Sequence, residues 1–333
     1  MKYSPRLGVS AVMFASLCSA AVDGTVQNRT TGKLQPGATV TLYKLGQAGM
    51  ESLESVKSDA QGRFSIAQTA NGPHLIQTAY DGVTYNHMLP PATPRTGLTL
   101  EVFNSSRQQG DAKIAQHMVL LEPSGDQLGV SESYVYRNDG RITYNDPDGG
   151  TLKFFVPAAA RGTLRVNATA PQGMPIERAA EPAGGADTYK IDFPIKPGET
   201  RIDLTYSVPF TAPGTFEGKV LHKEGATYLI APAGVTIKGE GLDSGRQEPR
   251  SRATIYELSR ADYKVEIDGS GSLRGMGAEE SAGPSVEQIL PRVYRNMYWI
   301  LGLAFAILAL GFTLLYRAPS PSAGKAGHGR GSH

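Results

Sequence analysis

An uncharged apolar run near the carboxyl end constrains this chain more than any other feature. Residues 297–316 read MYWILGLAFAILALGFTLLY, twenty positions without a charge or a proline. At about 1.5 Å per residue, a helix of this length spans about 30 Å, the thickness of a bilayer core. A buried helix of a soluble protein would normally show a polar face. Aromatic rings favour the membrane interface, and a basic residue closes the run. We therefore expect a single transmembrane helix anchored by Tyr298, Trp299, Tyr316 and Arg317.

The amino end has the layout of a removable secretion signal. Lys2 and Arg6 precede an uncharged run over 7–17, and small residues follow at 19–21. That run spans only about 17 Å as a helix, too little for a retained membrane anchor. Lipid attachment at Cys18 is the alternative, but Leu17 stands where that processing favours a small residue. We expect residues 1–21 to be a signal peptide.

These two elements together predict the topology of the chain. A removed signal followed by a stop-transfer helix places residues 22–296 outside the cytoplasm and 317–333 inside it. The tail carries Arg317, Lys325 and Arg330 and no acidic residue, as the positive-inside rule favours. We expect a single-pass protein of the bacterial cytoplasmic (inner) membrane, whose amino-terminal domains are periplasmic or extracellular.

Cysteine usage and charge narrow the environment and the partners. Cys18 is the only cysteine, so the chain without its signal forms no disulfide, which fits a bacterial envelope. Without the two basic residues of the signal and the three of the tail, 28 basic residues remain against 31 acidic ones. This mildly acidic balance gives no support to nucleic-acid binding.

Residues 22–94 have the pattern of a small β-domain. Apolar and β-branched residues alternate in short runs, and turn residues interrupt them at short intervals. Asp59 to Gly62 and the pair Asp81-Gly82 are typical turn sequences. We expect strands over 22–26, 38–43, 64–66 and 75–80.

This segment resembles a known domain family. The residues that carry the resemblance are VDGTVQNRTTGKLQPGATVTL from residue 22, SDAQGRFSI from residue 58 and GPHLIQTAYDG from residue 72. They resemble the carboxypeptidase regulatory-like domains of bacterial surface and periplasmic proteins. That resemblance implies a transthyretin-like, carbohydrate-binding-like β-sandwich over 22–94. Gly24 and Gly37 would permit close backbone approach or positive φ, while Asp59 and Gly62 would close a hairpin.

The family name mentions an enzyme, which would require a catalytic set of residues in this chain. Zinc peptidases need two histidines and a glutamate at the metal, usually opening with His-x-x-Glu or His-Glu-x-x-His. Neither motif occurs among the six histidines, and no nucleophile elbow, Walker loop or dinucleotide fingerprint is present. We expect no enzyme activity, no catalytic residue, no cofactor and no metal, although motifs alone do not exclude an unfamiliar active site. The histidines are His74, His87, His117, His222, His328 and His333.

A second β-rich region is predicted over 111–269. Its runs alternate more strictly, and no helical period separates them, which is typical of another sandwich. Pro194 to Glu199 reads as a proline-fixed turn feeding the alternating run over 200–206. Residues 270–296 read as a linker. The expected strands are 128–136, 151–156, 163–166, 189–193, 200–206, 218–222, 226–230, 253–258 and 263–267.

The fold class follows: all-β, with two tandem antiparallel β-sandwiches before a single carboxyl-terminal transmembrane helix. Three functions remain open, namely a binding or scaffolding protein, a polysaccharide-binding module, and a membrane subunit of an export or envelope-assembly complex. Sandwich edges and loops contact proteins without any special residue type, which favours the scaffold. The only tryptophan, Trp299, belongs to the membrane run, which weakens the sugar-binding reading. Expected partners are the bilayer through 297–316, envelope proteins and a polysaccharide.

Overall fold

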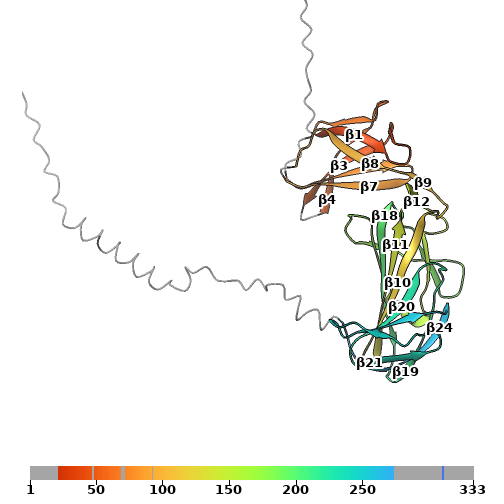
Figure 1. Ribbon diagram of the computed structural model, residues 1–333. Helices are drawn as coiled ribbons and strands as arrows, with labels where there is room; N and C mark the ends of the chain where they lie inside the picture. Colours follow the sequence, from red (N-terminus) through yellow and green to blue (C-terminus); the bar gives the residue numbers. More distant parts are fainter. Residues whose placement is uncertain (1–21, 47–48, 69–71, 92, 274–309, 311–333) are drawn as a thin grey trace, which may run out of the picture. The chain divides into compact units, whose positions relative to one another are not determined.

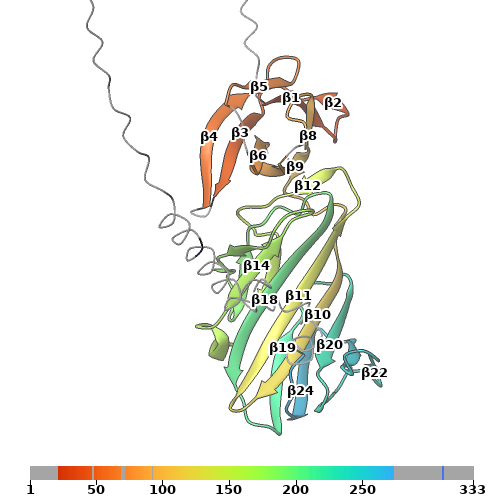
Figure 2. The ribbon, with the colours of Figure 1, turned by 90° about the vertical axis from the view of Figure 1, so that its left-hand side faces the viewer.

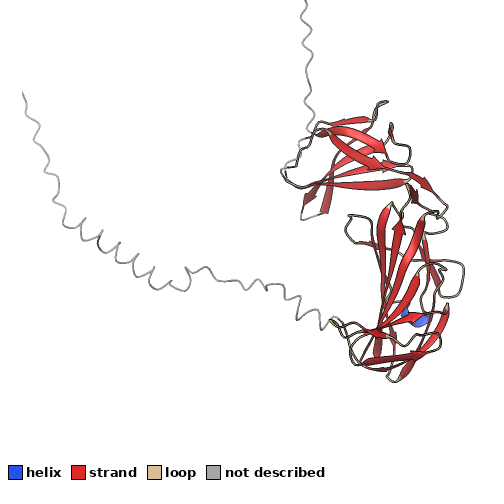
Figure 3. Ribbon diagram, viewed as in Figure 1, coloured by secondary structure: helices blue, strands red, loops and turns tan. Residues whose placement is uncertain are grey.

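The computed structural model describes residues 22–46, 49–68, 72–91, 93–273 and 310. Throughout these residues the chain is all-β, and the only helical segment with described bounds is the 3₁₀ turn η1 (Ala158–Ala160) (Figure 3). Two separate hydrophobic cores are present, the first built from residues up to 102 and the second from residue 112 onward. No helix in the described part of the chain is long and apolar enough to span a bilayer. The predicted signal peptide, membrane helix and tail lie outside these residues, except for residue 310.

Two four-stranded sheets enclose the first core (Figure 1). Alternation builds it: in β3, Val40 and Leu42 are fully buried, while the residues between and beside them are partly exposed. One sheet contains β2 (Lys33–Leu34), β1 (Val22–Asn28), β5 (Arg63–Ile66) and β8 (Leu98–Val102). The other runs in the order β4 (Gly49–Lys57), β3 (Thr39–Gly46), β6 (His74–Tyr80) and β7 (Val83–Leu89).

The boundary and the pairing of the first sandwich differ from the sequence prediction. Strand β8 lies beyond residue 94, yet it pairs with β1 from Gly24–Leu98 to Asn28–Val102, so the sandwich extends to residue 102. The β1–β8 pair is parallel, and so is the β10–β20 pair of the second sandwich. The two sandwiches are therefore mixed rather than purely antiparallel.

An eight-stranded sheet forms one side of the second sandwich (Figure 2). Its long central strands bury every second residue, among them Tyr134, Ile202 and Leu204. The order is β15 (Ile176–Arg178), β14 (Arg165–Thr169), β18 (Gly198–Pro209), β11 (Gln127–Asn138), β10 (Ala112–Ser124), β20 (Ala226–Ala231), β23 (Thr254–Leu258) and β22 (Arg246–Gln247).

Two three-stranded sheets complete the second core, and Phe154, Ile191, Phe216 and Val265 bring their side chains into it. The first contains β13 (Leu152–Phe155), β17 (Thr188–Ile191) and β16 (Glu181–Pro182). The second contains β19 (Gly214–Lys219), β24 (Asp262–Gly269) and β21 (Val235–Gly239).

A two-stranded parallel ladder joins the sandwiches. Strand β9 (Asn104–Ser106), which follows the first sandwich, pairs with β12 (Ile142–Tyr144), which belongs to the second. Residues on both sides fall in one compact unit. We call this ladder and its surrounding contacts the junction.

Candidate functional site

The four residues predicted at turns, three glycines and one aspartate, all lie among the described residues. Gly24 lies in β1 against β8, and a Cβ there would approach the Leu98 carbonyl oxygen to 2.1 Å. Only glycine fits so close to another backbone. Gly37 and Gly62 take positive φ, 73° and 71°. Both roles proposed for glycine, close approach and left-handed backbone, therefore occur.

The Asp59–Gly62 turn is tight but does not close a hairpin. Asp59 Oδ1 accepts from the backbone amides of Gln61 and Arg63, at 2.9 and 2.8 Å. The strands on either side of the turn, β4 and β5, belong to opposite sheets: β4 pairs with β3 and β5 with β1. The hairpin prediction was wrong because turn residues specify a reversal of direction without specifying the partner of the next strand. The anchor residues Tyr298, Trp299, Tyr316 and Arg317 lie outside the described residues.

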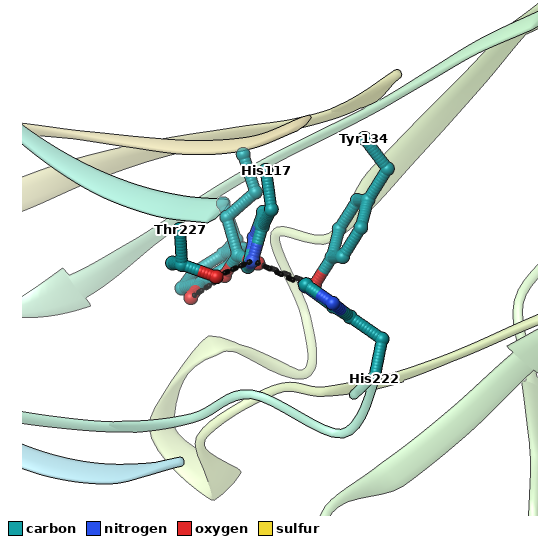
Figure 4. Close-up of polar contacts among 6 residues, drawn as sticks. His117, Tyr134, His222 and Thr227 are labelled. Atoms are coloured by element: carbon teal, nitrogen blue, oxygen red, sulfur yellow. Dashed lines mark hydrogen bonds and ion pairs between the residues drawn. The ribbon is translucent and has the colours of Figure 1, made fainter. Parts of the chain in front are cut away.

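The most concentrated polar chemistry lies inside the second sandwich. We call it the His117 network: His117 on β10, Glu132 and Tyr134 on β11, Tyr206 on β18, His222 in the loop before β20, and Thr227 on β20 (Figure 4). His117 is 1% exposed and Glu132 6%. The sequence predicts a strand around Glu132, but its pattern does not indicate that these residues contact one another.

A β-bulge turns His117 inward. The register of β10 against β11 shifts between Ile114 and Gln116, so Ala115 has no partner. Before the bulge Ala112 and Ile114 are buried, and after it the buried positions become His117 and Val119. Since side chains alternate along a strand, one extra residue moves all that follow to the other face. Without the bulge, His117 would point away from the core.

Glu132 is held by three donors. Tyr206 Oη donates to one carboxylate oxygen at 2.6 Å and Tyr134 Oη to the other at 2.9 Å. His117 Nε2 lies 3.1 Å from that second oxygen. Burial first, and the Glu132 charge second, raise the pKa of both tyrosines well above the usual range, so they stay neutral donors. The arrangement satisfies a buried carboxylate, which would otherwise be costly.

The hydrogen-bond partners of His117 and His222 place a proton between the two imidazole rings. His222 Nδ1 lies 2.6 Å from the carbonyl oxygen of Glu224, which only accepts, so Nδ1 carries a hydrogen. His117 Nε2 likewise donates to the Glu132 carboxylate. The remaining nitrogens, His222 Nε2 and His117 Nδ1, lie 3.1 Å apart. A hydrogen bond between them needs a proton on one of these two nitrogens.

His222 favours its neutral form. Burial, and next the electrostatic effect of His117, lower the pKa of His222 from its ordinary value. Stacked on Tyr134 with ring centroids 3.9 Å apart, His117 is fixed in position. The network attaches the loop at residues 220–225 to the sheet, and its half-buried end lies at His222. Within the described residues, no group of three or more His, Cys, Asp or Glu side chains is arranged to hold a metal.

A second polar cluster lies at the junction. Tyr85 Oη donates to the Phe103 carbonyl oxygen at 3.0 Å and accepts from Thr143 Oγ1, 2.9 Å away, so it joins the two sandwiches. Thr143 is fully buried. Asn28 Nδ2 donates to Asn104 Oδ1 at 2.7 Å in the same region. These contacts are short, largely enclosed and mutually satisfied, so the junction is a built interface rather than a loose tether.

A cleft of about 430 Å³ opens beside the junction. The first sandwich lines it with Tyr85, His87 and Phe103, and the second with Gln172 and Lys196. Lys196 Nζ donates to the Thr84 carbonyl oxygen at 2.5 Å and lies 5.1 Å from the centre of the Tyr85 ring. The residue that sequence analysis put in a proline-fixed turn is thus a contact between the sandwiches.

Comparison with known proteins identifies no family. The chain matches no protein-family profile and no curated protein. Its structural neighbours include the M1 zinc metallopeptidase from Deinococcus radiodurans, at 10% identity and a TM-score of 0.26, covering 47% of this chain and 42% of that one. A mutant of the two-domain M1 zinc metallopeptidase bound to L-tryptophan matches at 10% identity and a TM-score of 0.26, over 48% and 43%. The chain spans less than half the length of these structures, and likeness at this level carries no argument about function.

Proposed function

We propose that this chain is a non-catalytic, membrane-anchored extracytoplasmic protein that displays two joined β-sandwiches for binding or scaffolding. The junction is the observation that carries this proposal. A platform must hold its modules in a fixed mutual arrangement, and the β9–β12 ladder with the buried Tyr85–Thr143 hydrogen bond does so. Loose linkers, by contrast, leave relative domain motion as the default.

Two segments of the sequence support a location of the sandwiches outside the cytoplasm. The signal-like segment 1–21 and the apolar run 297–316 together favour a single-pass chain of the bacterial inner membrane, with the sandwiches outside the cytoplasm. The resemblance of 22–94 to carboxypeptidase regulatory-like domains agrees with an envelope protein. We include these features in the proposal.

Protease protection tests the topology. We would express the full chain in a Gram-negative bacterium, prepare spheroplasts and add protease. The proposal expects the sandwiches to be digested and a fragment containing the carboxyl-terminal tail to be protected. Protected sandwiches together with a shaved tail would reverse the topology and remove the proposed role.

Crosslinking in intact membranes tests the scaffold itself. Recovery of defined envelope proteins, lost when the junction is broken by Tyr85→Phe combined with Asn104→Ala, would support a platform that needs both sandwiches in place. Recovery of one export or assembly complex would identify the chain as a membrane subunit of that machine. If no protein is recovered while the chain binds a purified polysaccharide, the protein-scaffold function is contradicted.

A further inference from the structure

One lysine at the junction has no counterion. Lys196 Nζ donates to the carbonyl oxygen of Thr84, and among the described residues no carboxylate lies within ion-pair distance of it. Burial lowers the pKa of this ammonium to about 8. A partly buried cation without a paired anion is costly to keep, and such groups gather at functional sites.

The residues before and after Lys196 fix the position of its backbone. Ile195, fully buried, makes an isolated β-bridge with Tyr144 and exchanges backbone hydrogen bonds with it at 2.8 and 3.1 Å. Pro197 restricts Lys196 to extended conformations. The side chain therefore starts from a fixed point and reaches across to the first sandwich without large freedom.

A turn that lines the cleft together with Lys196 also shows an unusual conformation. Gln172, in the turn closed by the Gly173 amide bonding to the Ala170 carbonyl at 2.9 Å, has φ of 56°. Turns of this kind favour glycine or asparagine at that position, because a larger side chain is strained there. A strained residue that presents an amide side chain beside the cleft is the kind of outlier found at ligand sites.

Another charged depression among the described residues lacks this feature. It is wider, about 660 Å³, and lies over β19 and β24. Its cations are already paired: Lys264 with Glu217 at 2.7 Å, Lys219 with Asp262 at 3.2 Å, and Arg260 with Glu240. Such exposed pairs are ordinary surface features. Lys196 differs because its charge is left for a ligand to neutralise.

We propose that the cleft beside Lys196 binds the carboxylate of a small monoanionic ligand about the size of one sugar ring. The volume of the cleft lies near the lower end of the range for ligand sites. The ammonium would be the counterion, and the Tyr85 and Phe103 rings and the Gln172 amide would contact the rest of the ligand. Glu101 also lines the cleft, 3.4 Å from Arg29, so a dianion such as phosphate would leave uncompensated negative charge there.

This inference rests on the proposed binding function and specifies the ligand chemistry. The test is calorimetric titration of the purified full-length chain with D-glucuronate, D-glucose and inorganic phosphate near pH 7. We expect glucuronate to bind and glucose, which has the ring without the carboxylate, not to bind. Equal binding of the two sugars, or tighter binding of phosphate than of glucuronate, would overturn the proposal.

Two variants make the test specific. Lys196→Met should weaken glucuronate binding about tenfold or more, because a charge-assisted contact is lost. Lys190→Met is the matched control: Lys190 is also largely buried, but its Nζ lies 3.6 Å from Glu181, away from the cleft, and we expect unchanged binding. Equal affinity of wild type and Lys196→Met would refute the site.

A titration of pH supplies a readout that needs no substitution. Glucuronate keeps its charge above neutral pH, whereas the ammonium of Lys196 is lost as pH rises through about 8. Binding by the wild-type chain should therefore weaken between about pH 7 and pH 9, and a flat profile would contradict the role of Lys196. Absence of any glucuronate binding would refute this site only, since protease protection and crosslinking judge the scaffold independently.

Discussion

Glu132 shows how a single residue can organise a core. Its neighbours are apolar side chains or donors directed at its carboxylate, so its charge is tolerated only while those donors stay in place. Removing one partner of a buried charged pair leaves the other uncompensated, which costs much more than an exposed pair is worth. The His117 network is therefore a point at which the second sandwich is sensitive to small chemical changes.

We expect Glu132→Gln to lower the free energy of unfolding by about 2–4 kcal/mol, because the neutral amide cannot accept from all three donors and leaves buried polar groups unsatisfied. Urea unfolding followed by circular dichroism measures it. Glu177→Gln is the control, since that side chain is 68% exposed and lies 3.8 Å from Arg165. A loss below about 0.5 kcal/mol for Glu132→Gln, within the range of surface changes, would contradict the network's role.

The lowered pKa of His222 predicts a pH effect on stability. In the unfolded chain His222 titrates near its ordinary value of 6.5, whereas in the fold it protonates only at lower pH. The unfolded state therefore binds more protons in that window, so stability falls as pH drops below about 6.5. His222→Gln should remove this component, and the stability difference between wild type and variant should shrink on acidification. A constant difference from pH 7.5 to pH 5 would count against it.

The lowered pKa of Lys196 also makes stability rise with pH, over a higher range than for His222. Its folded pKa of about 8 lies below the unfolded value of 10.5, so its charge destabilises the fold at neutral pH. We expect Lys196→Met to melt at a higher temperature than wild type at pH 7. The gap should narrow between about pH 8 and pH 10.5, where the wild-type lysine becomes neutral in the fold but not in the unfolded chain. Thermal melts over that range test this, and a less stable variant at pH 7 would disagree.

At the scale of elements, two short features decide where strands can lie. Gly24 lets β8 approach β1, and the Ala115 bulge sets which face of the sheet the side chains of β10 point to.

Gly24→Ala should lower the free energy of unfolding by about 2 kcal/mol or more, because the added methyl meets the Leu98 backbone. Gly32→Ala is the control: no atom lies within 4 Å of its Cβ position, and only its φ of 72° opposes the change. Comparable losses for the two in urea unfolding would argue against the close approach.

Deleting Ala115 tests whether the bulge sets the phase of β10. The deletion removes the residue that has no partner on β11, so Ile114 and His117 become two positions apart and both keep the core face. We expect cooperative unfolding and a near-ultraviolet circular dichroism spectrum close to those of wild type, as for Ala115→Ser, whose side chain is exposed. Loss of cooperative unfolding in the deletion variant alone would contradict this account of the bulge.

The strands also show how much of the fold could be predicted from the sequence. The all-β class was predicted correctly, and most of the expected strands correspond to observed ones, because period-two alternation needs only local pattern: 128–136 corresponds to β11 and 226–230 to β20. About half of the observed strands, among them β4, β7, β8 and β21, were not predicted. Strand β10, at the centre of the large sheet, was missed because its alternation changes phase at the bulge. Residues 218–222 were assigned to a strand, but β19 ends at Lys219 and the loop carrying His222 follows.

The candidate sites could not be predicted from the sequence, for a different reason. The His117 network joins four adjacent strands of one sheet and a loop, and the spacing of these residues in the sequence does not indicate such contacts. Lys196 was noticed only as part of a turn, since its partner Thr84 is 112 positions away. The leader and the membrane helix remain predictions, as they lie outside the described residues.

At the scale of the whole molecule, the junction should couple the stabilities of the two cores. We expect a single calorimetric unfolding transition in wild type. Tyr85→Phe removes the hydroxyl shared by Phe103 and Thr143 and should cost about 1–3 kcal/mol. Combined with Asn104→Ala, it should split the transition into two. Tyr43→Phe, on the same sandwich, is the control. Two transitions already in wild type would mean that the cores are energetically independent.

The parallel pairing of β1 with β8 bears on how the molecule is made. A chain that emerges amino end first carries an open edge on its first strand until residue 102 has appeared, more than seventy positions later. Contacts so distant along the chain delay folding, and exposed strand edges recruit other strands in the meantime. Biogenesis of this protein should therefore depend on holding chaperones, and aggregation of nascent chains should begin at that edge.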